Sequence, residues 1–237
     1  MKKNYKFDLS IVVPCFNEED NIEIVLDEII ACKKKSDLNI EIIVVNDGST
    51  DKTFEKCAKY NKSTYIKLIN HKKNKGFGAA FWSGVYAANG KYLIMVPGDG
   101  EARFKRVLFA TKLLGNVDII LTFFTNKTKR SFSRRFLSKI FTSIINLTFG
   151  TKLNYTNGMN IYPTDALKNI ECESSGFFFQ AEIIVKLLLK NLSFAEVPIK
   201  LDSRFNGTSK AVRLSILFII IKDYISLIRY VYFNKKK

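Results

Sequence analysis

Residues 40–50 read IEIIVVNDGST, an apolar, β-branched run that passes directly into a polar turn. A short apolar run of this kind is typical of a strand that is buried on both faces, as strands in parallel sheets are. Similar runs occur at residues 9–13, 65–69 and 92–96. The sequence therefore predicts a sheet that contains these three strands and a fourth at 40–45.

Helical patterns separate the predicted strands. After the first strand, apolar residues recur on one face at the α-helical period, at Ile22, Val25, Leu26, Ile29 and Ile30. Ser49 or Thr50 is expected to cap a helix that runs through Cys57, and another helix is expected around 79–88. Repeated β-α-β units predict an α/β fold, with a mostly parallel sheet flanked by helices.

Polar and acidic residues follow three of the predicted strands. Asn17 and Glu18 follow the first strand, Asp47 follows the second, and Asp99 and Glu101 follow the fourth. In such a sheet, ligands bind beyond the carboxyl ends of the strands, where several loops converge. One acidic loop is usually a turn or a helix cap. Three at one edge indicate a nucleotide and metal site.

Asp99 and Glu101 are two residues apart, so an extended loop would point both side chains to one side. Carboxylate oxygens bind hard divalent cations, and a cation can neutralise the charge that develops on a departing diphosphate. We therefore expect Mg²⁺ or Mn²⁺ at these two residues, with a surface turn as the alternative. Asp47 is expected near the same diphosphate, where it accepts hydrogen bonds from a base or ribose.

The net charge of +16 requires anionic partners. Residues 119–164 contain no Asp or Glu, and this stretch and the C-terminus are rich in Lys and Arg. A partner nucleic acid is disfavoured because no zinc-finger, helix-turn-helix or RNP signature is present. The four cysteines form no CxxC pair, which predicts reduced thiols and a cytoplasmic location. The brief apolar run near the N-terminus predicts no signal peptide.

Four segments in order resemble the signature of family 2 glycosyltransferases, which have the GT-A (Rossmann-like) fold. They are IVVPCFNEEDNI (11–22), VVNDGSTDKT (44–53), NKGFGAAFWSG (74–84) and LIMVPGDGE (93–101). Two further segments, NYTNGMNIYP (154–163) and EVPIKLDSRFNGTSK (196–210), resemble elements of the dolichol-phosphate-mannose synthase-like group of polyprenyl-phosphate sugar synthases. The resemblance covers about residues 8–212.

The resemblance implies roles for individual residues. The nucleotide-binding set would be Pro14, Asn17, Glu18, Asp47, Lys75, Gly76 and Asp99. The set that binds phosphate or the acceptor would be Arg134, Ser138, Arg204, Ser209 and Lys210, with Gly207 beside them. The metal ligands would be Asp99 and Glu101, and the residues assigned to catalysis are Asp99, Arg204 and Glu182.

Two positions depart from the family pattern. Pro97 stands where the family has the first aspartate of its DxD motif, so the metal site would rest on fewer carboxylates. Asn154 stands where the family has an aspartate, which keeps hydrogen bonding but loses charge. A catalytically impaired homologue that only binds nucleotide sugar therefore remains an alternative to an active enzyme.

The acceptor is inferred from the absence of a base motif. A hydroxyl must lose its proton as it attacks, whereas a phosphate monoester, with a second pKa of about 6, is already ionised. The family's Glu-Asp pair and Gln-x-x-Arg-Trp motif are missing, although Glu182 remains a candidate base. We therefore expect an inverting transfer from a GDP- or UDP-sugar to dolichyl or undecaprenyl phosphate. Transfer to a hydroxyl of a cell-surface glycan is the alternative.

Two basic, apolar segments are expected to bind a membrane surface or the protein core. In the first, Leu137, Ile140, Phe141, Ile144 and Ile145 share one helical face, with Arg134 and Ser138 on another. The second, 212–233, is interrupted by charges and predicts one or two amphipathic helices. We accordingly divide the chain into a GT-A domain (1–211) and a tail (212–237), peripheral on the inner face of the membrane. Packing of the tail on a second copy stays open.

Overall fold

The computed structural model describes residues 4–126, 132–172, 174, 176, 178–202 and 214–233. Its strands are β1 (Phe7–Cys15), β2 (Ile40–Asn46), β3 (Ile66–Asn70), β4 (Gly90–Met95), β5 (Ile119–Phe124), β6 (Ile161–Pro163) and β7 (Phe194–Ile199). Its α-helices are α1 (Ile22–Lys34), α2 (Thr53–Ala58), α3 (Phe77–Ala87), α4 (Phe132–Phe149), α5 (Thr164–Lys168), α6 (Phe179–Leu188) and α7 (Leu214–Tyr232). Two 3₁₀ helices, η1 (Phe104–Arg106) and η2 (Leu108–Leu113), follow β4.

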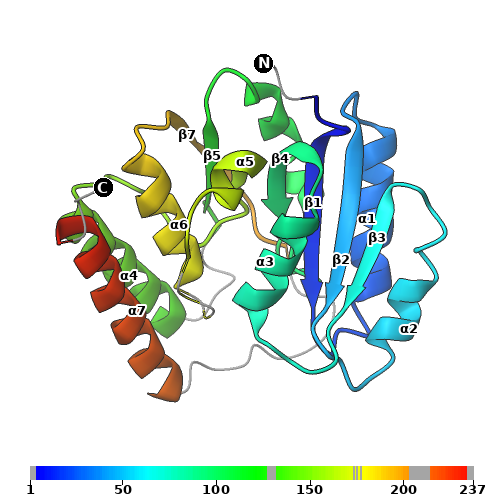
Figure 1. Cartoon of the computed structure of the whole chain (residues 1–237), viewed down its shortest axis with the longest axis horizontal. Coiled ribbons are helices and arrows are strands. Elements are labelled where there is room, and N and C mark those ends of the chain that lie inside the picture. Colours follow the sequence, from blue (N-terminus) through cyan, green and yellow to red (C-terminus); the bar gives the residue numbers. More distant parts are fainter. Residues whose placement is uncertain are drawn as a thin grey trace.

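The strands form one seven-stranded sheet in the order β3-β2-β1-β4-β6-β5-β7 (Figure 1). The four strands predicted from the sequence are β1 to β4, and they pair in parallel. Among the strands of the described residues, β6 alone runs antiparallel to its neighbours, β4 and β5. The prediction of a mostly parallel sheet is confirmed. One boundary differs, since β1 continues through Pro14, where a proline near a strand end removes only one ladder donor.

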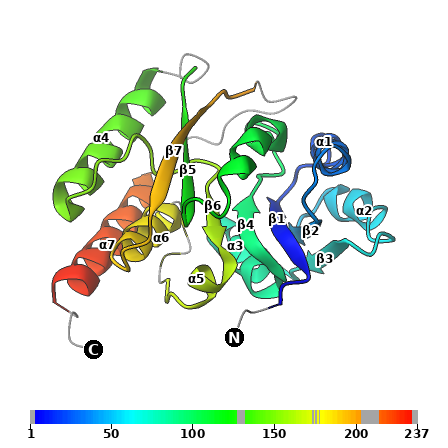
Figure 2. The same cartoon turned by 90° about the horizontal axis from the view of Figure 1, so that it is seen from above.

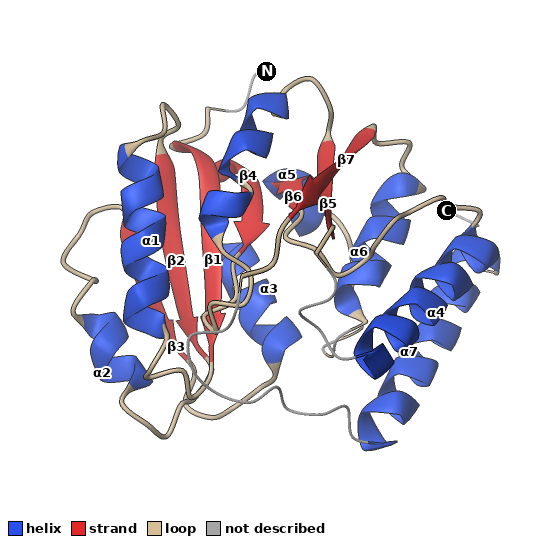
Figure 3. Ribbon diagram, turned by 180° about the vertical axis from the view of Figure 1, so that it is seen from behind, coloured by secondary structure: helices blue, strands red, loops and turns tan. Residues whose placement is uncertain are grey.

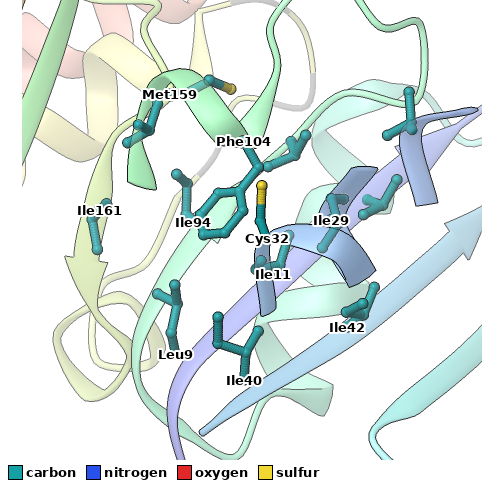
Figure 4. Close-up of a cluster of buried hydrophobic side chains, with 14 of the residues drawn as sticks. Leu9, Ile11, Ile29, Cys32, Ile40, Ile42, Ile94, Phe104, Met159 and Ile161 are labelled. Atoms are coloured by element: carbon teal, nitrogen blue, oxygen red, sulfur yellow. The ribbon is translucent and has the colours of Figure 1, made fainter. Parts of the chain in front are cut away.

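Alternate residues of the central strands pack against helices on opposite faces. Ile11 and Ile42 belong to the cluster that includes residues of α1 and η1, which Figure 4 shows in close-up. Val12 and Ile43 belong to a second cluster with α3 and α6. Figure 2 shows α1 and α3 on opposite sides of the sheet. Because both faces are covered, β1 and β2 contain continuous apolar runs rather than an alternating pattern.

The cap expected for α2 was wrong. This helix begins at Thr53, and the residue before it, Lys52, makes no side-chain capping bond. Ser49 Oγ instead donates to Asn46 Oδ1 at 2.5 Å, and the Thr50 N–H donates to Asn17 Oδ1 at 2.9 Å. Ser49 Oγ also accepts from the Asn17 N–H at 3.0 Å, so both residues connect the loops after β1 and β2.

Helices α4 and α7 lie side by side at the end of the molecule remote from α2 (Figure 3). Ile145 of α4 packs in one buried cluster with Leu227 and Val231 of α7. The Thr148 and Tyr224 hydroxyls are 2.6 Å apart. The predicted tail thus includes a single helix within the described residues, and one of its faces packs on the protein. The predicted boundary at 211/212 lies outside the described residues.

The apolar face predicted for α4 is only partly in the core. Ile145 is buried, but Leu137, Ile140 and Ile144 are 56%, 41% and 43% exposed. The core alternative is therefore wrong for these three residues. None of the described helices combines the length and apolar character needed to cross a bilayer.

Candidate active site

The carboxyl ends of β1 to β4 are held together by backbone hydrogen bonds between their loops. The Asp47 N–H donates to Cys15 O at 2.9 Å, and the His71 N–H donates to Asn46 O at 2.9 Å. The Gly98 N–H donates to Pro14 O at 3.1 Å. The loops that carry the predicted nucleotide and metal residues therefore begin at one edge of the sheet, as the sequence predicts.

The first loop binds the second through Asn17 and Glu18. Asn17 adopts a left-handed backbone conformation (φ 54°), and its N–H donates to Ser49 Oγ at 3.0 Å. The Glu18 N–H donates to Thr53 Oγ1 at 2.8 Å, and its carboxylate accepts from Asn21 Nδ2. Pro14, at the end of β1, is buried. Asn17 is exposed at the edge, so it remains a candidate for nucleotide contact.

Asp47 organises the loop that follows β3. Its carboxylate accepts from the backbone N–H of Lys75 at 2.9 Å on Oδ1 and from that of Gly76 at 2.8 Å on Oδ2. Its Oδ1 also lies 2.7 Å from Nδ1 of His71. Three of the predicted nucleotide-binding residues, Asp47, Lys75 and Gly76, are therefore in direct contact.

Gly48 lets the loops after β2 and β3 approach closely. A Cβ at this position, where φ is +70°, would lie 2.4 Å from the carbonyl carbon of Lys73. Such a contact is not tolerated by backbone atoms, so only glycine fits. This close approach brings Asp47 to the loop it binds.

Asp99 and Glu101 lie in a turn after β4, not in the extended loop expected. The Glu101 N–H donates to Asp99 Oδ1 at 3.0 Å, and Gly100 between them has φ 70°. Side chains two residues apart therefore need not share a side as they would in a strand. The turn predicted as the alternative is present, and both carboxylates are half-buried.

Glu101 connects this turn to two other parts of the chain. Its Oε2 lies 3.7 Å from Arg134 Nη2 on α4. Its backbone carbonyl accepts from the Asp202 N–H at 3.3 Å. Arg106 donates to both Asp202 oxygens, at 3.0 and 2.8 Å, and this guanidinium holds the pKa of Asp202 below its ordinary value.

A cationic cavity of about 280 Å³ lies between α4, the end of β5 and residues 153–155. It is lined by Phe124, Arg134, Arg135, Ser138, Lys139, Thr142, Ser143, Asn146, Leu153, Asn154 and Tyr155. Arg134 and Ser138, the predicted phosphate-binding pair, share this wall with Arg135 and Lys139. Sequence reasoning did not assign Arg135 or Lys139, although both belong to the basic cluster at 127–139.

Asp99 and Glu101 are the candidate cation ligands by the chemistry of their oxygen atoms. Asp99 and Glu101 offer hard oxygen donors, and a cation such as Mg²⁺ typically takes one or two carboxylates with phosphate and water oxygens for the rest. Within the described ranges, no three His, Cys, Asp or Glu side chains gather as a metal site. The metal prediction, which names Asp99 and Glu101, stays a prediction.

Glu182 of α6 lies in a buried network that includes residues before the helix. Its Oε1 is 2.7 Å from Lys186 Nζ, and its Oε2 accepts from Ser174 N–H and Oγ at 3.0 and 2.7 Å. The Cys172 thiol also donates to Oε2 at 3.0 Å; burial, then the Glu182 carboxylate, raises the pKa of that thiol. These contacts favour a structural role for Glu182 over the predicted role as a base.

The remaining predicted residues, Arg204, Gly207, Ser209 and Lys210, lie outside the described residues. Sequence reasoning also treated His71 as an ordinary loop residue, whereas it is buried between Asp47 and Ser83. Its position directly after β3, at the edge where ligands bind, was the signal that could have identified it.

Comparison with known proteins identifies a family and several relatives of the chain. A family model described as Glycosyl transferase family 2 matches residues 10–171. The chain is 38% identical to dolichyl-phosphate beta-glucosyltransferase of Dictyostelium discoideum over 105 residues, which cover 41% of this chain and 32% of that protein. It is 28% identical to the Saccharomyces cerevisiae protein of the same name over 223 residues, which cover 81% of this chain and 66% of the relative.

Solved structures with the same arrangement of strands and helices include glucosyl-3-phosphoglycerate synthase from Mycobacterium tuberculosis. Its complex with Mg²⁺ and UDP superposes with a TM-score of 0.70 at 17% identity, covering 95% of this chain and 79% of that one. A complex with Mn²⁺, UDP-glucose and phosphoglyceric acid gives 0.71 at 19% identity, covering 94% and 80%. At such identities the likeness shows the fold alone, and it confirms the predicted GT-A class.

Proposed function

The chain belongs to glycosyl transferase family 2, and we propose that it is an inverting enzyme that transfers a sugar from a nucleoside-diphosphate sugar to a polyprenyl phosphate. The cationic cavity beside Glu101 carries this proposal. Arg134, Arg135 and Lys139 line it, and Arg134 reaches within 3.7 Å of Glu101 in the candidate metal turn. An anionic acceptor held there lies next to the place where a donor diphosphate would bind.

The lining of the cavity favours a phosphate over a hydroxyl as the nucleophile. Of the described residues that line it, none is Asp, Glu or His. A hydroxyl acceptor needs such a base, whereas a phosphate monoester is ionised near neutral pH, with its second pKa at about 6. Arg134 and Lys139 would hold the acceptor oxygen near the anomeric carbon. The new C–O bond forms as the bond to the leaving diphosphate breaks, with inversion.

The donor would bind along the carboxyl edge of the sheet. Asp47 shapes the loop that presents Lys75 and Gly76, which would contact the nucleotide together with Asn17. Asp99 and Glu101 would hold Mg²⁺ or Mn²⁺, which neutralises charge on the departing diphosphate. The M. tuberculosis enzyme is crystallised with these cations and UDP, which supports a UDP-sugar ahead of a GDP-sugar.

The relatives named dolichyl-phosphate beta-glucosyltransferase support glucose and a polyprenyl phosphate as the substrates. The test is to incubate the full chain with radiolabelled UDP-glucose or GDP-mannose and undecaprenyl or dolichyl phosphate. We expect a lipid-linked sugar from UDP-glucose that requires Mn²⁺ or Mg²⁺. Labelling of undecaprenol or of an oligosaccharide, but not of the lipid phosphate, would instead establish a hydroxyl acceptor. Donor binding without any transfer would establish an impaired homologue.

We also propose that α4 and α7 place the enzyme on the inner face of a membrane. Both helices expose apolar residues at helical spacing: Phe136, Ile140, Ile144 and Leu147 on α4, and Phe218, Ile221, Ile225 and Tyr232 on α7. Arg134, Lys139, Lys222 and Arg229 lie on the same helices. Cations beside exposed apolar side chains suit an anionic lipid surface, where each contributes about 1 kcal/mol.

Vesicle flotation tests this membrane role. The full chain is expected to float with vesicles that contain anionic lipid, and less so at high salt. Leu147→Asp combined with Phe218→Asp is expected to abolish most flotation. Tyr86→Asp is the matched control, because Tyr86 is 67% exposed on α3, away from α4 and α7. Equal loss of flotation in the control, or none in the double variant, would refute the assignment.

A further inference from the structure

The chain contains a single histidine, and its imidazole joins three elements of the candidate site. His71 is 7% exposed. Its Nδ1 lies 2.7 Å from Asp47 Oδ1, at the end of β2, and its Nε2 lies 2.9 Å from Ser83 Oγ on α3. An ionised carboxylate can only accept a hydrogen bond. Nδ1 therefore carries the proton, and in the neutral ring Nε2 accepts from the Ser83 hydroxyl.

The same carboxylate determines the shape of the loop that ends at Gly76. Asp47 receives hydrogen bonds from His71, from the Lys75 N–H and from the Gly76 N–H. A carboxylate has about four acceptor positions, so about one is left for a nucleotide. The imidazole fixes the rotamer of Asp47, and Asp47 fixes the backbone at Lys75 and Gly76.

We propose that His71 is a positioning residue for the nucleotide, which holds Asp47 and the Lys75–Gly76 backbone in the conformation that binds the donor. This inference rests on the proposed function, because it concerns the donor site of that enzyme. His71 itself need not touch the substrate. Its removal lets the carboxylate rotate, and the donors that keep the loop in place are then lost together.

The contacts from Asp47 to His71 to Ser83 resemble a catalytic triad with a serine nucleophile. The surroundings of Ser83 exclude that catalytic role. Ser83 lies inside α3, where nearby backbone N–H groups are committed to helical hydrogen bonds. Acyl transfer needs two free donors for the oxyanion beside the nucleophile. The helix interior does not provide them, so the serine is an anchor for the imidazole.

The tautomer can be tested on the full chain without assignment, since one histidine gives one imidazole signal set. A long-range ¹H–¹⁵N spectrum of the histidine-labelled protein is expected to show Nδ1 protonated and Nε2 unprotonated. The reverse tautomer would overturn the proposal, as would rapid averaging between the two, because neither is compatible with a fixed donor to Asp47. This readout is independent of any activity.

Affinity for the nucleotide provides the second test. Titration calorimetry with UDP and Mn²⁺ is expected to show at least about tenfold weaker binding for His71→Phe. His71→Asn should lose less, because its amide N–H can replace Nδ1 as the donor to Asp47. Lys72→Gln, exposed in the same loop, is the control and should bind within about twofold of the unmodified chain.

In turnover, we expect the donor KM to rise while kcat changes less, the split that marks loss of ground-state binding. Binding within about twofold for His71→Phe would overturn the positioning role. If His71→Phe does not fold, the nucleotide affinity of His71→Asn and the tautomer of the unmodified chain test the positioning role. Failure of the unmodified chain to bind any sugar nucleotide would instead refute the proposed function. This outcome differs from a failure of the positioning role, in which the unmodified chain binds the nucleotide.

Discussion

Replacement of Lys186 by methionine tests whether the buried network around Glu182 is structural. The Lys186 ammonium lies 2.7 Å from Glu182 Oε1, and the two side chains are 2% and 5% exposed. It also donates to Glu171 O at 2.6 Å and lies 4.1 Å from the centre of the Tyr230 ring on α7. Met has a similar length but no charge, so Lys186→Met leaves a buried carboxylate without its cation.

The size of the effect follows from these contacts. Removal of one partner of a buried pair typically costs about 3–5 kcal/mol. Ser174 and Cys172 still donate to Glu182 Oε2, so the cost at Glu182 is expected at the lower end of that range, about 3 kcal/mol. The Glu171 carbonyl loses a donor, which adds about 1 kcal/mol. For a chain of this size each kcal/mol lowers Tm by about 2–4 °C, so a fall of about 8–16 °C is expected.

Thermal unfolding followed by circular dichroism measures this shift. Lys190→Met is the matched control: Lys190 follows α6, is exposed, and donates to the backbone carbonyl of Asn169 at 3.1 Å. Its unfolding free energy should change by about 0.5 kcal/mol or less. The double variant Glu182→Gln with Lys186→Met should unfold above Lys186→Met alone, because no unpaired charge remains. Equal melting of the Lys186→Met and Lys190→Met proteins would refute a structural ion pair.

Glu182→Gln separates stability from catalysis. If Glu182 is structural, the folded variant should keep kcat within about threefold, whereas loss of a general base costs about 10²–10⁴-fold. A loss in the latter range, with the protein still folded, would restore the role as a base and with it the hydroxyl acceptor.

Three further outcomes are expected. Arg134→Ala should raise the KM for the lipid phosphate about tenfold or more, because a hydrogen bond to a charged group contributes about 1.5–3 kcal/mol. The donor KM should stay nearly unchanged. An equal rise in both KM values in steady-state assays would contradict this role. Glu101→Gln should raise the Mn²⁺ concentration needed for half-maximal transfer, and an unchanged metal titration would remove Glu101 from the ligand set. Arg106 lowers the pKa of Asp202. The pair therefore stabilises the fold above the ordinary carboxyl pKa of about 4, and this stabilisation is lost as the pH falls from there through the lower pKa of the folded state. Asp202→Asn should reduce the acid dependence of the unfolding free energy, measured by denaturant titration between pH 3 and 6.

The sequence predicts those strands of the sheet whose own residues are apolar enough to indicate burial. The runs that became β1 and β2 have consecutive apolar residues at Ile11–Val13 and Ile42–Val45, so their burial on both faces is apparent without knowledge of the partners. The strand β6 contains only Ile161–Pro163. Its antiparallel place between β4 and β5 depends on pairing with distant residues, which no local pattern encodes.

The candidate site shows the same division. Asp47 and Asp99 were identifiable because each follows a buried strand at the ligand-binding edge. The turn at Asp99 depends on the positive φ of Gly100, and the burial of Glu182 depends on contacts with Cys172 and Ser174, which precede α6. Exposure on α4 also could not be predicted, since an amphipathic pattern does not reveal how much of its apolar face a neighbour covers.

The hydrogen bonds of Asp47 determine which of the three acidic loops can bind a metal ion. A carboxylate that holds three donors of the loop after β3 cannot also serve as a principal metal ligand, because each bound donor occupies a position the cation would need. With Pro97 at the position of a family aspartate, the charge available to a cation comes from Asp99 and Glu101. Arg134 beside Glu101 lowers the net negative charge of that turn still further. Metal affinity should then depend on the donor diphosphate, so that cation and nucleotide sugar bind together rather than in sequence, and calorimetry with Mn²⁺ alone should show weaker binding than with UDP present.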